Sequence, residues 1–194
     1  QFWAVVRTLL ENCRDVKEAL SMLKDMPVAY NLNLIVLDRE GHCALVETLD
    51  GRMAVKTIDR DSGEQALYAT NHPVLEELIP YEPQAFVHSI RRYDNITAFL
   101  EWHRQGITAG QLKAFFLTPY PEGLSCSYYS QFFGTTKTMV LDPVQGSLSL
   151  CWGGRPENGW HDFSFSDPFP QETASIEIQN QTADPSIFTY RRLI

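Results

Sequence analysis

Asn71 and Arg92 are the residues whose types and spacing in this chain best fit a chemical role. Asn71 lies in the sequence ATNHP (69–73), where we expect a strand over Gln65 to Thr70 to end, because Pro73 supplies no N–H to continue a ladder. Arg92 lies further along the chain in the sequence SIRRY (89–93), within a helical pattern.

The chemistry that these two residues offer is stabilisation of negative charge. An Asn at a strand end can direct its amide N–H at a developing oxyanion, and an Arg on a neighbouring helix holds a charge that does not titrate. Together they could stabilise a tetrahedral intermediate. Neither of them can attack a carbonyl, so a nucleophile has to come from elsewhere.

Each of these residues also has a structural interpretation. An Asn before His-Pro is a common turn residue, and Arg92 could pair with Asp94 or Glu101 on the helix surface. Arg91 competes with Arg92 for the same role. His72 is a candidate pocket residue, although a His beside a strand end is more often a hydrogen-bonded structural group.

Length and charge set limits on the class of protein. A chain of 194 residues with 44% hydrophobic and 21% charged residues predicts one globular domain over residues 1–194. The formal charge of −8, with no basic stripe, argues against nucleic acid as a partner. No apolar run approaches the roughly 20 residues that span a bilayer, so we expect no membrane partner.

The four cysteines, Cys13, Cys43, Cys126 and Cys151, lie far apart and form no C-x-x-C pair. This spacing fits buried free thiols in a reducing compartment, and we expect a cytoplasmic protein without a zinc site, another metal or an organic cofactor. Cys126 with a His could be drawn as a thiol-protease pair, but no local signature supports that interpretation.

The first half of the chain predicts two helices followed by an antiparallel meander. The helices are expected over Phe2–Asn12 and from Asp15 to Pro27, with Asp15 and Glu18 as a capping box. The strands are expected over Asn33–Asp38, His42–Leu49 and Arg52–Ile58, where Asp50-Gly51 indicates a type I′ hairpin.

The second half predicts a long helix over Pro83–Arg104, a helix capped by Thr108 that runs through Phe116, and three strands. The strands are expected over Thr135–Leu141, Ser147–Trp152 and Ser175–Gln179. Runs of strands beside runs of helices indicate an α+β fold with mainly antiparallel sheets.

Several short motifs together carry a resemblance to a known family. They are NLIVLD (33–38) with Gly41 and VE (46–47), TNH (70–72), SIRRY (89–93), and LDP (141–143). In this order and spacing they resemble the C-terminal part of the acyl-CoA:6-aminopenicillanic acid acyltransferase and choloylglycine hydrolase group, over roughly Val5 to Pro156. These are N-terminal nucleophile (Ntn) hydrolases that act on linear amide C–N bonds.

The resemblance implies a four-layer αββα sandwich and a catalytic cysteine whose own α-amino group is its base. It implies that Asn71 donates to the oxyanion and that Arg92 lies near the cysteine and favours thiolate. We prefer Arg92 to Arg91 because the family places its Arg directly before an aromatic residue. The substrate would be a small amide or acyl compound.

The nucleophilic cysteine of this family belongs upstream of the present sequence, which begins at Gln1. We therefore expect these residues to be the C-terminal portion of a larger Ntn domain, with the cysteine on a missing segment or a separate subunit, and to be inactive alone. Exposed sheet edges in such a portion would favour pairing with another chain, a homo-oligomer included. The alternative hypothesis is a non-catalytic binding domain or partner subunit that lacks the nucleophile.

Overall fold

The computed structural model describes residues 2–168 and 175–193, and its internal contacts divide the chain into two compact units. The first unit comprises Gln1–Ser89 and Tyr190–Ile194, and the second comprises Ile90–Thr189. The division falls within helix α3 (Val87–Trp102). One domain over residues 1–194 stays a prediction.

The first unit opens with the two predicted helices, α1 (Phe2–Asn12) and α2 (Val16–Asp25). Asp15 caps α2 by accepting a hydrogen bond of 2.8 Å from the Glu18 N–H. Glu18 reaches back as expected for a capping box, but its carboxylate accepts from the N–H of Arg14 at 2.9 Å. The preceding residue thus takes the place that Asp15 has in the usual form of the motif.

The meander is confirmed as an antiparallel sheet in the order β1-β2-β3, with strands β1 (Leu32–Leu37), β2 (Cys43–Leu49) and β3 (Arg52–Ile58). Asp50 and Gly51 have φ values of 48° and 76°, which both central positions of a type I′ turn require. The dipeptide signal in the sequence therefore fixes the register between β2 and β3.

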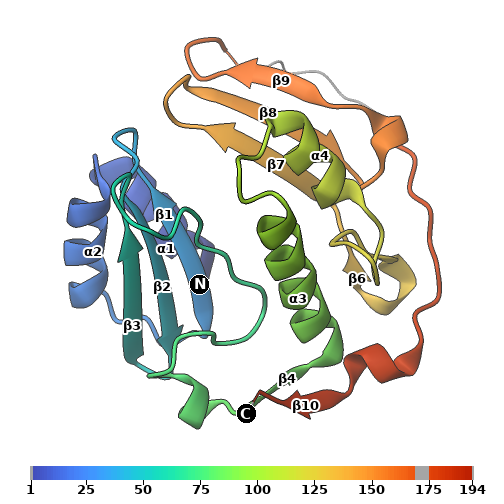
Figure 1. The fold of residues 1–194 in the computed structure, drawn as a ribbon, viewed down its shortest axis with the longest axis horizontal. Helices are drawn as coiled ribbons and strands as arrows, with labels where there is room; N and C mark the ends of the chain where they lie inside the picture. Colours follow the sequence, from blue (N-terminus) through green and yellow to red (C-terminus); the bar gives the residue numbers. More distant parts are fainter. Residues whose placement is uncertain (1, 169–174, 194) are drawn as a thin grey trace. The chain divides into compact units, whose positions relative to one another are not determined.

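The two faces of this sheet bury different partners, because successive side chains of β2 alternate between them. Ala44 and Val46 have no exposed surface and pack with Leu23 and other residues of α1 and α2, which lie along one face (Figure 1). Leu45 and Leu49 face the other way and pack against Leu75 and Leu78. Burying each aliphatic side chain contributes about 1.5–3 kcal/mol.

The strand predicted over Gln65–Thr70 is wrong, because residues 64–70 have no regular secondary structure. Leu67 and Ala69 still pack on the core beside Leu45. The backbone of this segment has no neighbouring strand, and the carbonyl of Thr70 accepts instead from the side chain of Asn33. This segment is apolar enough to pack on the core, but its backbone forms no hydrogen bonds of a β-sheet.

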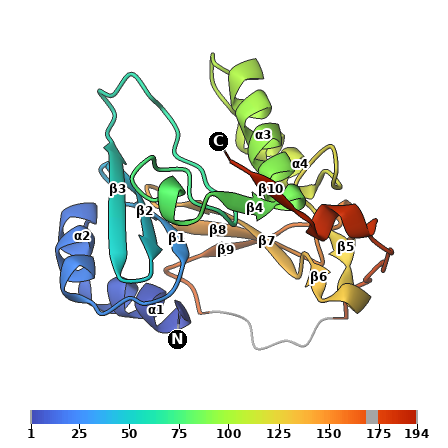
Figure 2. The same cartoon turned by 90° about the horizontal axis from the view of Figure 1, so that it is seen from below.

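The predicted long helix begins later than Pro83, because a short strand precedes it. Strand β4 (Gln84–Phe86) pairs with β10 (Tyr190–Arg192), as Figures 1 and 2 show. Helix α3 then starts at Val87 and ends at Trp102. Strands of three residues are too short to show a periodic pattern in the sequence, and these two lie far apart along the chain.

The second unit continues α3 and adds helix α4 (Ala109–Leu117), which has a complete capping box between Thr108 and Gln111. Its main sheet is antiparallel in the order β7-β8-β9, with strands β7 (Lys137–Asp142), β8 (Ser147–Trp152) and β9 (His161–Ser164). Helix α4 packs against β7 (Figure 1). A further short pair consists of β5 (Ser127–Tyr128) and β6 (Phe133–Gly134).

The strand predicted over Ser175–Gln179 is wrong, because these residues have no regular structure. The Asn158 side chain bonds both backbone groups of Glu177, donating to its carbonyl at 2.9 Å and accepting from its N–H at 3.1 Å. The Asn158 amide thus makes the two backbone hydrogen bonds that a neighbouring strand would otherwise make. The α+β class with antiparallel sheets is confirmed.

Candidate active site

The loop Thr70–Leu75, which carries Asn71, is held by two polar side chains of the first sheet. Asn33 on β1 and Glu47 on β2 lie directly opposite each other in the register. The Asn33 amide donates to the carbonyls of Thr70 at 2.7 Å and His72 at 2.8 Å. Because these bonds are made to backbone atoms, they fix the path of the chain on either side of Asn71.

Glu47 holds the end of the same loop. Its side chain is 1% exposed and accepts from the N–H groups of Val74 at 2.8 Å and Leu75 at 3.0 Å. Burial raises the pKa of the Glu47 carboxyl above its usual value, although the N–H groups of Leu75 and Val74 oppose that rise. A buried carboxylate is tolerated here because backbone donors satisfy it.

Ser89 at the start of α3 holds the centre of the loop. Its side chain has no exposed surface, and its Oγ accepts from the N–H of Asn71 at 2.8 Å and lies 2.8 Å from His72 Nδ1. The Ser89 hydroxyl also lies 3.1 Å from Thr70 Oγ1. The Thr70 hydroxyl donates to the backbone carbonyl of Ser89 at 3.0 Å.

The His72 ring is held by two hydroxyls of this network. Its Nδ1 lies 2.8 Å from Ser89 Oγ and 3.1 Å from Thr70 Oγ1. Because a hydroxyl can donate or accept, these contacts satisfy His72 with the proton on either ring nitrogen. His72 is 7% exposed, which fits the structural interpretation of this residue.

Asn71 itself is exposed, in contrast to the buried residues that hold its backbone. It lines a cavity of about 270 Å³ together with His72. The other lining residues all belong to the first unit: Asn31, Leu32, Asn33, Glu47, Thr48, Leu49, Thr70, Pro73, Leu78 and Glu82. A fixed backbone at a cavity wall is one requirement of a pre-organised donor, and Asn71 meets it.

Arg92 lies on α3 in the second unit, where it is half-buried. Its guanidinium carbon lies 5.8 Å from the centre of the Phe133 ring. Burial lowers the pKa of Arg92, whereas the neighbouring Cys126 thiol and Tyr120 phenol act to raise it. In return Arg92 lowers the pKa of Cys126, although burial raises that pKa more.

Arg91 has a different environment from Arg92. It is exposed, and its Nε donates to the carbonyl of Pro121 at 3.3 Å. Of the two candidates, Arg92 is the one whose charge is partly withdrawn from water. Asn71 and His72 belong to the first unit and Arg92 to the second.

A comparison with protein-family models matches residues 1–157 to the family described as acyl-coenzyme A:6-aminopenicillanic acid acyl-transferase. The chain belongs to this acyltransferase family. Searches of curated proteins and of solved structures gave no significant match. Membership of the acyltransferase family agrees with the predicted Ntn-hydrolase group and with the α+β class.

Within this acyltransferase chain, sequence reasoning assigned no role to Asn33, Glu47 or Ser89. All three lie in the motifs that carried the resemblance, and a polar residue inside an apolar strand was the available signal for Asn33 and Glu47. Their function in the fold is to hold the Asn71 loop.

The cysteines of the acyltransferase chain are all free, as predicted. Cys126 and Cys151 are buried, while Cys13 and Cys43 are half-buried, so the expectation of burial holds for two of the four. Within residues 2–168 and 175–193, no group of three or more His, Cys, Asp and Glu side chains is arranged to hold a metal ion. Over the same residues, no helix combines the length and the apolar character needed to cross a bilayer.

Proposed function

We propose that this chain is part of an Ntn amidohydrolase or acyltransferase that acts on linear amide bonds. The observation that carries the proposal is the Asn71 loop, whose backbone is held by Ser89 and Asn33 while Asn71 lines a cavity. Family membership supports the reaction class.

The nucleophile in this proposal is an N-terminal cysteine outside the present sequence. Its sulfur attacks the carbonyl carbon of the substrate, and its own α-amine takes the thiol proton. Asn71 donates to the oxyanion of the tetrahedral intermediate, and Arg92 supplies a fixed positive charge that favours thiolate. The C–N bond then breaks, the amine leaves with the proton, and water or another amine resolves the thioester.

The decisive experiment compares the full-length protein with its Asn71→Ala and Asn71→Asp variants on a panel of chromogenic N-acyl anilides. Both changes remove the N–H donor, and we expect kcat to fall by about 10²–10³. The matched control is Asn31→Ala, since Asn31 lines the same cavity and donates to Glu82 at 3.2 Å. A fall below about threefold in both Asn71 variants would remove Asn71 from the mechanism.

A second measurement separates the enzyme from the non-catalytic alternative. Mass spectrometry of full-length protein quenched during turnover should find the acyl group on the N-terminal cysteine as a thioester. A full-length protein that binds the anilides without an acylated cysteine and without turnover would be a binding domain.

A further inference from the structure

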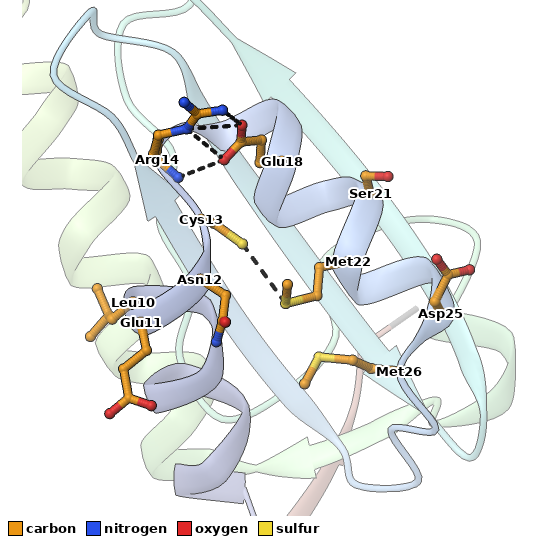
Figure 3. A pocket seen from close by; sticks show the side chains of 10 residues that line it. All are labelled: Leu10, Glu11, Asn12, Cys13, Arg14, Glu18, Ser21, Met22, Asp25 and Met26. Atoms are coloured by element: carbon orange, nitrogen blue, oxygen red, sulfur yellow. Dashed lines mark hydrogen bonds and ion pairs between the residues drawn. The ribbon is translucent and has the colours of Figure 1, made fainter.

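Three sulfur-bearing side chains of the first unit extend into one open cavity between α1 and α2, as Figure 3 shows. They belong to Cys13, Met22 and Met26, which we call the sulfur cluster. The cavity has a volume of about 880 Å³. It is separate from the cavity that Asn71 lines, with which it has no lining residue in common.

The local structure explains why the three side chains line one cavity. Cys13 follows the last residue of α1, and its N–H bonds the carbonyl of Leu9 at 2.9 Å. Met22 lies on α2 and Met26 is the residue that caps its C-terminal end, four positions later, so both project from the same side. The short connection between the helices brings Cys13 to that side.

The spacing of two of the sulfurs suits a shared metal ion. Cys13 Sγ lies 3.8 Å from Met22 Sδ. If one ion lay about 2.3 Å from each sulfur, a usual metal–thiolate distance, the sulfur–metal–sulfur angle would be about 110°. That angle is close to tetrahedral, so both sulfurs could bind one ion with little movement.

The ligand type limits the choice of ion. Thiolate and thioether sulfurs are soft ligands that suit Cu(I), zinc and iron–sulfur clusters, and a set of one thiolate with two neutral thioethers suits the monovalent Cu(I) among these. The remaining side chains of the cavity wall include the carboxylates of Glu11, Glu18 and Asp25 and one guanidinium, that of Arg14, which is paired with Glu18 at 2.6 Å. Glu11 is likewise paired, with Arg7 at 2.7 Å, so the choice of ion depends on the sulfur ligands and not on the charge of the wall.

We propose that the sulfur cluster binds one soft monovalent metal ion, Cu(I) or its analogue Ag(I). On binding, the Cys13 thiol releases its proton to solvent as the sulfur–metal bond forms, and the two thioethers add as neutral donors. No electron is transferred. The site requires side chains that are within reach of solvent, and all three are only half-buried.

The competing explanation is packing, because these side chains also lie against the apolar core of the first unit. Packing alone would tolerate leucine, since Met and Leu exchange at nearly constant volume. Metal binding would not tolerate it, because leucine has no sulfur. The two explanations therefore predict opposite results for Met22→Leu and Met26→Leu.

The first test is an anaerobic competition between the reduced chain and the Cu(I) complex of bicinchoninate, followed by the colour of the chelate. The wild type should withdraw one equivalent of copper, Cys13→Ser should withdraw none, and each Met→Leu variant should bind at least about tenfold more weakly, as expected when one soft ligand is lost. Cys43→Ser and Met139→Leu are the controls and should behave as the wild type. Failure of the wild type to withdraw copper, or wild-type binding by Met22→Leu, would overturn the site.

The second test does not depend on a variant that folds. In protein labelled with ¹³C at its methionine methyl groups, one equivalent of Ag(I) should shift the signals of Met22 and Met26. Met139, on β7 in the second unit, provides an unshifted internal reference. Unmoved Met22 and Met26 signals at that ratio would refute the proposal.

Discussion

Ser89 shows how one hydroxyl can determine the position of a candidate site residue. Ser89, which has no exposed surface, accepts from the Asn71 N–H and also bonds Thr70 and His72. A backbone N–H in a loop would otherwise rely on water, which exchanges and lets the loop move. The hydroxyl thus fixes the backbone position from which the Asn71 side chain extends.

Ser89→Ala should destabilise the protein by about 1–3 kcal/mol, because the Asn71 N–H loses its buried acceptor. Urea unfolding measures this change. Ser21→Ala is the control, since Ser21 is exposed on α2 and its loss should fall within about 0.5 kcal/mol. Equal stability of the two variants would show that Ser89 does not hold the loop.

An experiment on thiol reactivity can distinguish Arg92 from Arg91. In the full-length protein, Arg92→Leu should raise the pKa of the nucleophilic thiol by about 1 unit or more, because an attractive charge is lost. Labelling of that cysteine by iodoacetamide at neutral pH, located by mass spectrometry, should slow about tenfold for such a shift. Arg91→Leu should label at the wild-type rate, and the reverse pattern would assign the role to Arg91.

At the scale of elements, the hairpin that joins β1 to β2 is tied to the start of α2 by one buried carboxylate. Asp38 accepts from the N–H groups of Glu40 and His42 at 3.0 Å and Val16 at 3.3 Å, and from the His42 ring at 3.0 Å. Burial raises the pKa of Asp38, but the hydrogen bonds from His42 and Val16 outweigh it, so the pKa is lowered overall.

A lowered carboxyl pKa contributes stability above the unfolded value of about 3.9, and this contribution is lost as pH falls through the folded value. Asp38→Asn should therefore be about 1–3 kcal/mol less stable at pH 7. It should also lose less stability than the wild type on acidification below about pH 5. Asp50→Asn is the control, because its side chain is 91% exposed.

Chemical denaturation at a series of pH values gives both quantities. If the Asn variant and the wild type lose the same free energy of unfolding on acidification, Asp38 does not carry the linkage. The Asp50→Asn curve shows how much of any change comes from net charge alone.

Local signals predicted the elements that local forces build. The Asp50-Gly51 turn and the Thr108 capping box were readable because backbone conformation and short-range hydrogen bonds decide them. The predictions for Gln65–Thr70 and Ser175–Gln179 failed because a strand needs a neighbour, and side-chain amides of Asn33 and Asn158 take that place.

The candidate site was readable in part for the same reason. The motif around Asn71 marks a candidate site residue, but the residues that hold its loop come from β1, β2 and the start of α3. Contacts between segments so far apart leave no periodic trace in a single sequence. For the same reason, the sequence alone did not predict the pairing of β4 with β10.

For the whole molecule, the charge of −8 makes a prediction about partners. We expect no band shift with duplex DNA at low salt and about 10 µM protein, a concentration at which non-specific binders with dissociation constants of about 10⁻⁴–10⁻⁶ M begin to bind. A salt-sensitive shift would mean that Arg191-Arg192 or another basic pair forms a functional patch. Duplex with a basic DNA-binding protein serves as the positive control.

The buried hydroxyl of Ser89 has a consequence for the solvent exchange of the backbone across the whole chain. Loop amides usually exchange their hydrogen for deuterium quickly, whereas those in sheet ladders are protected. The amide of Asn71 belongs to no ladder, yet its acceptor is shielded from water completely. In a deuterium-uptake map it should stand out as a slow position within an irregular segment, on the timescale of the strands that surround it.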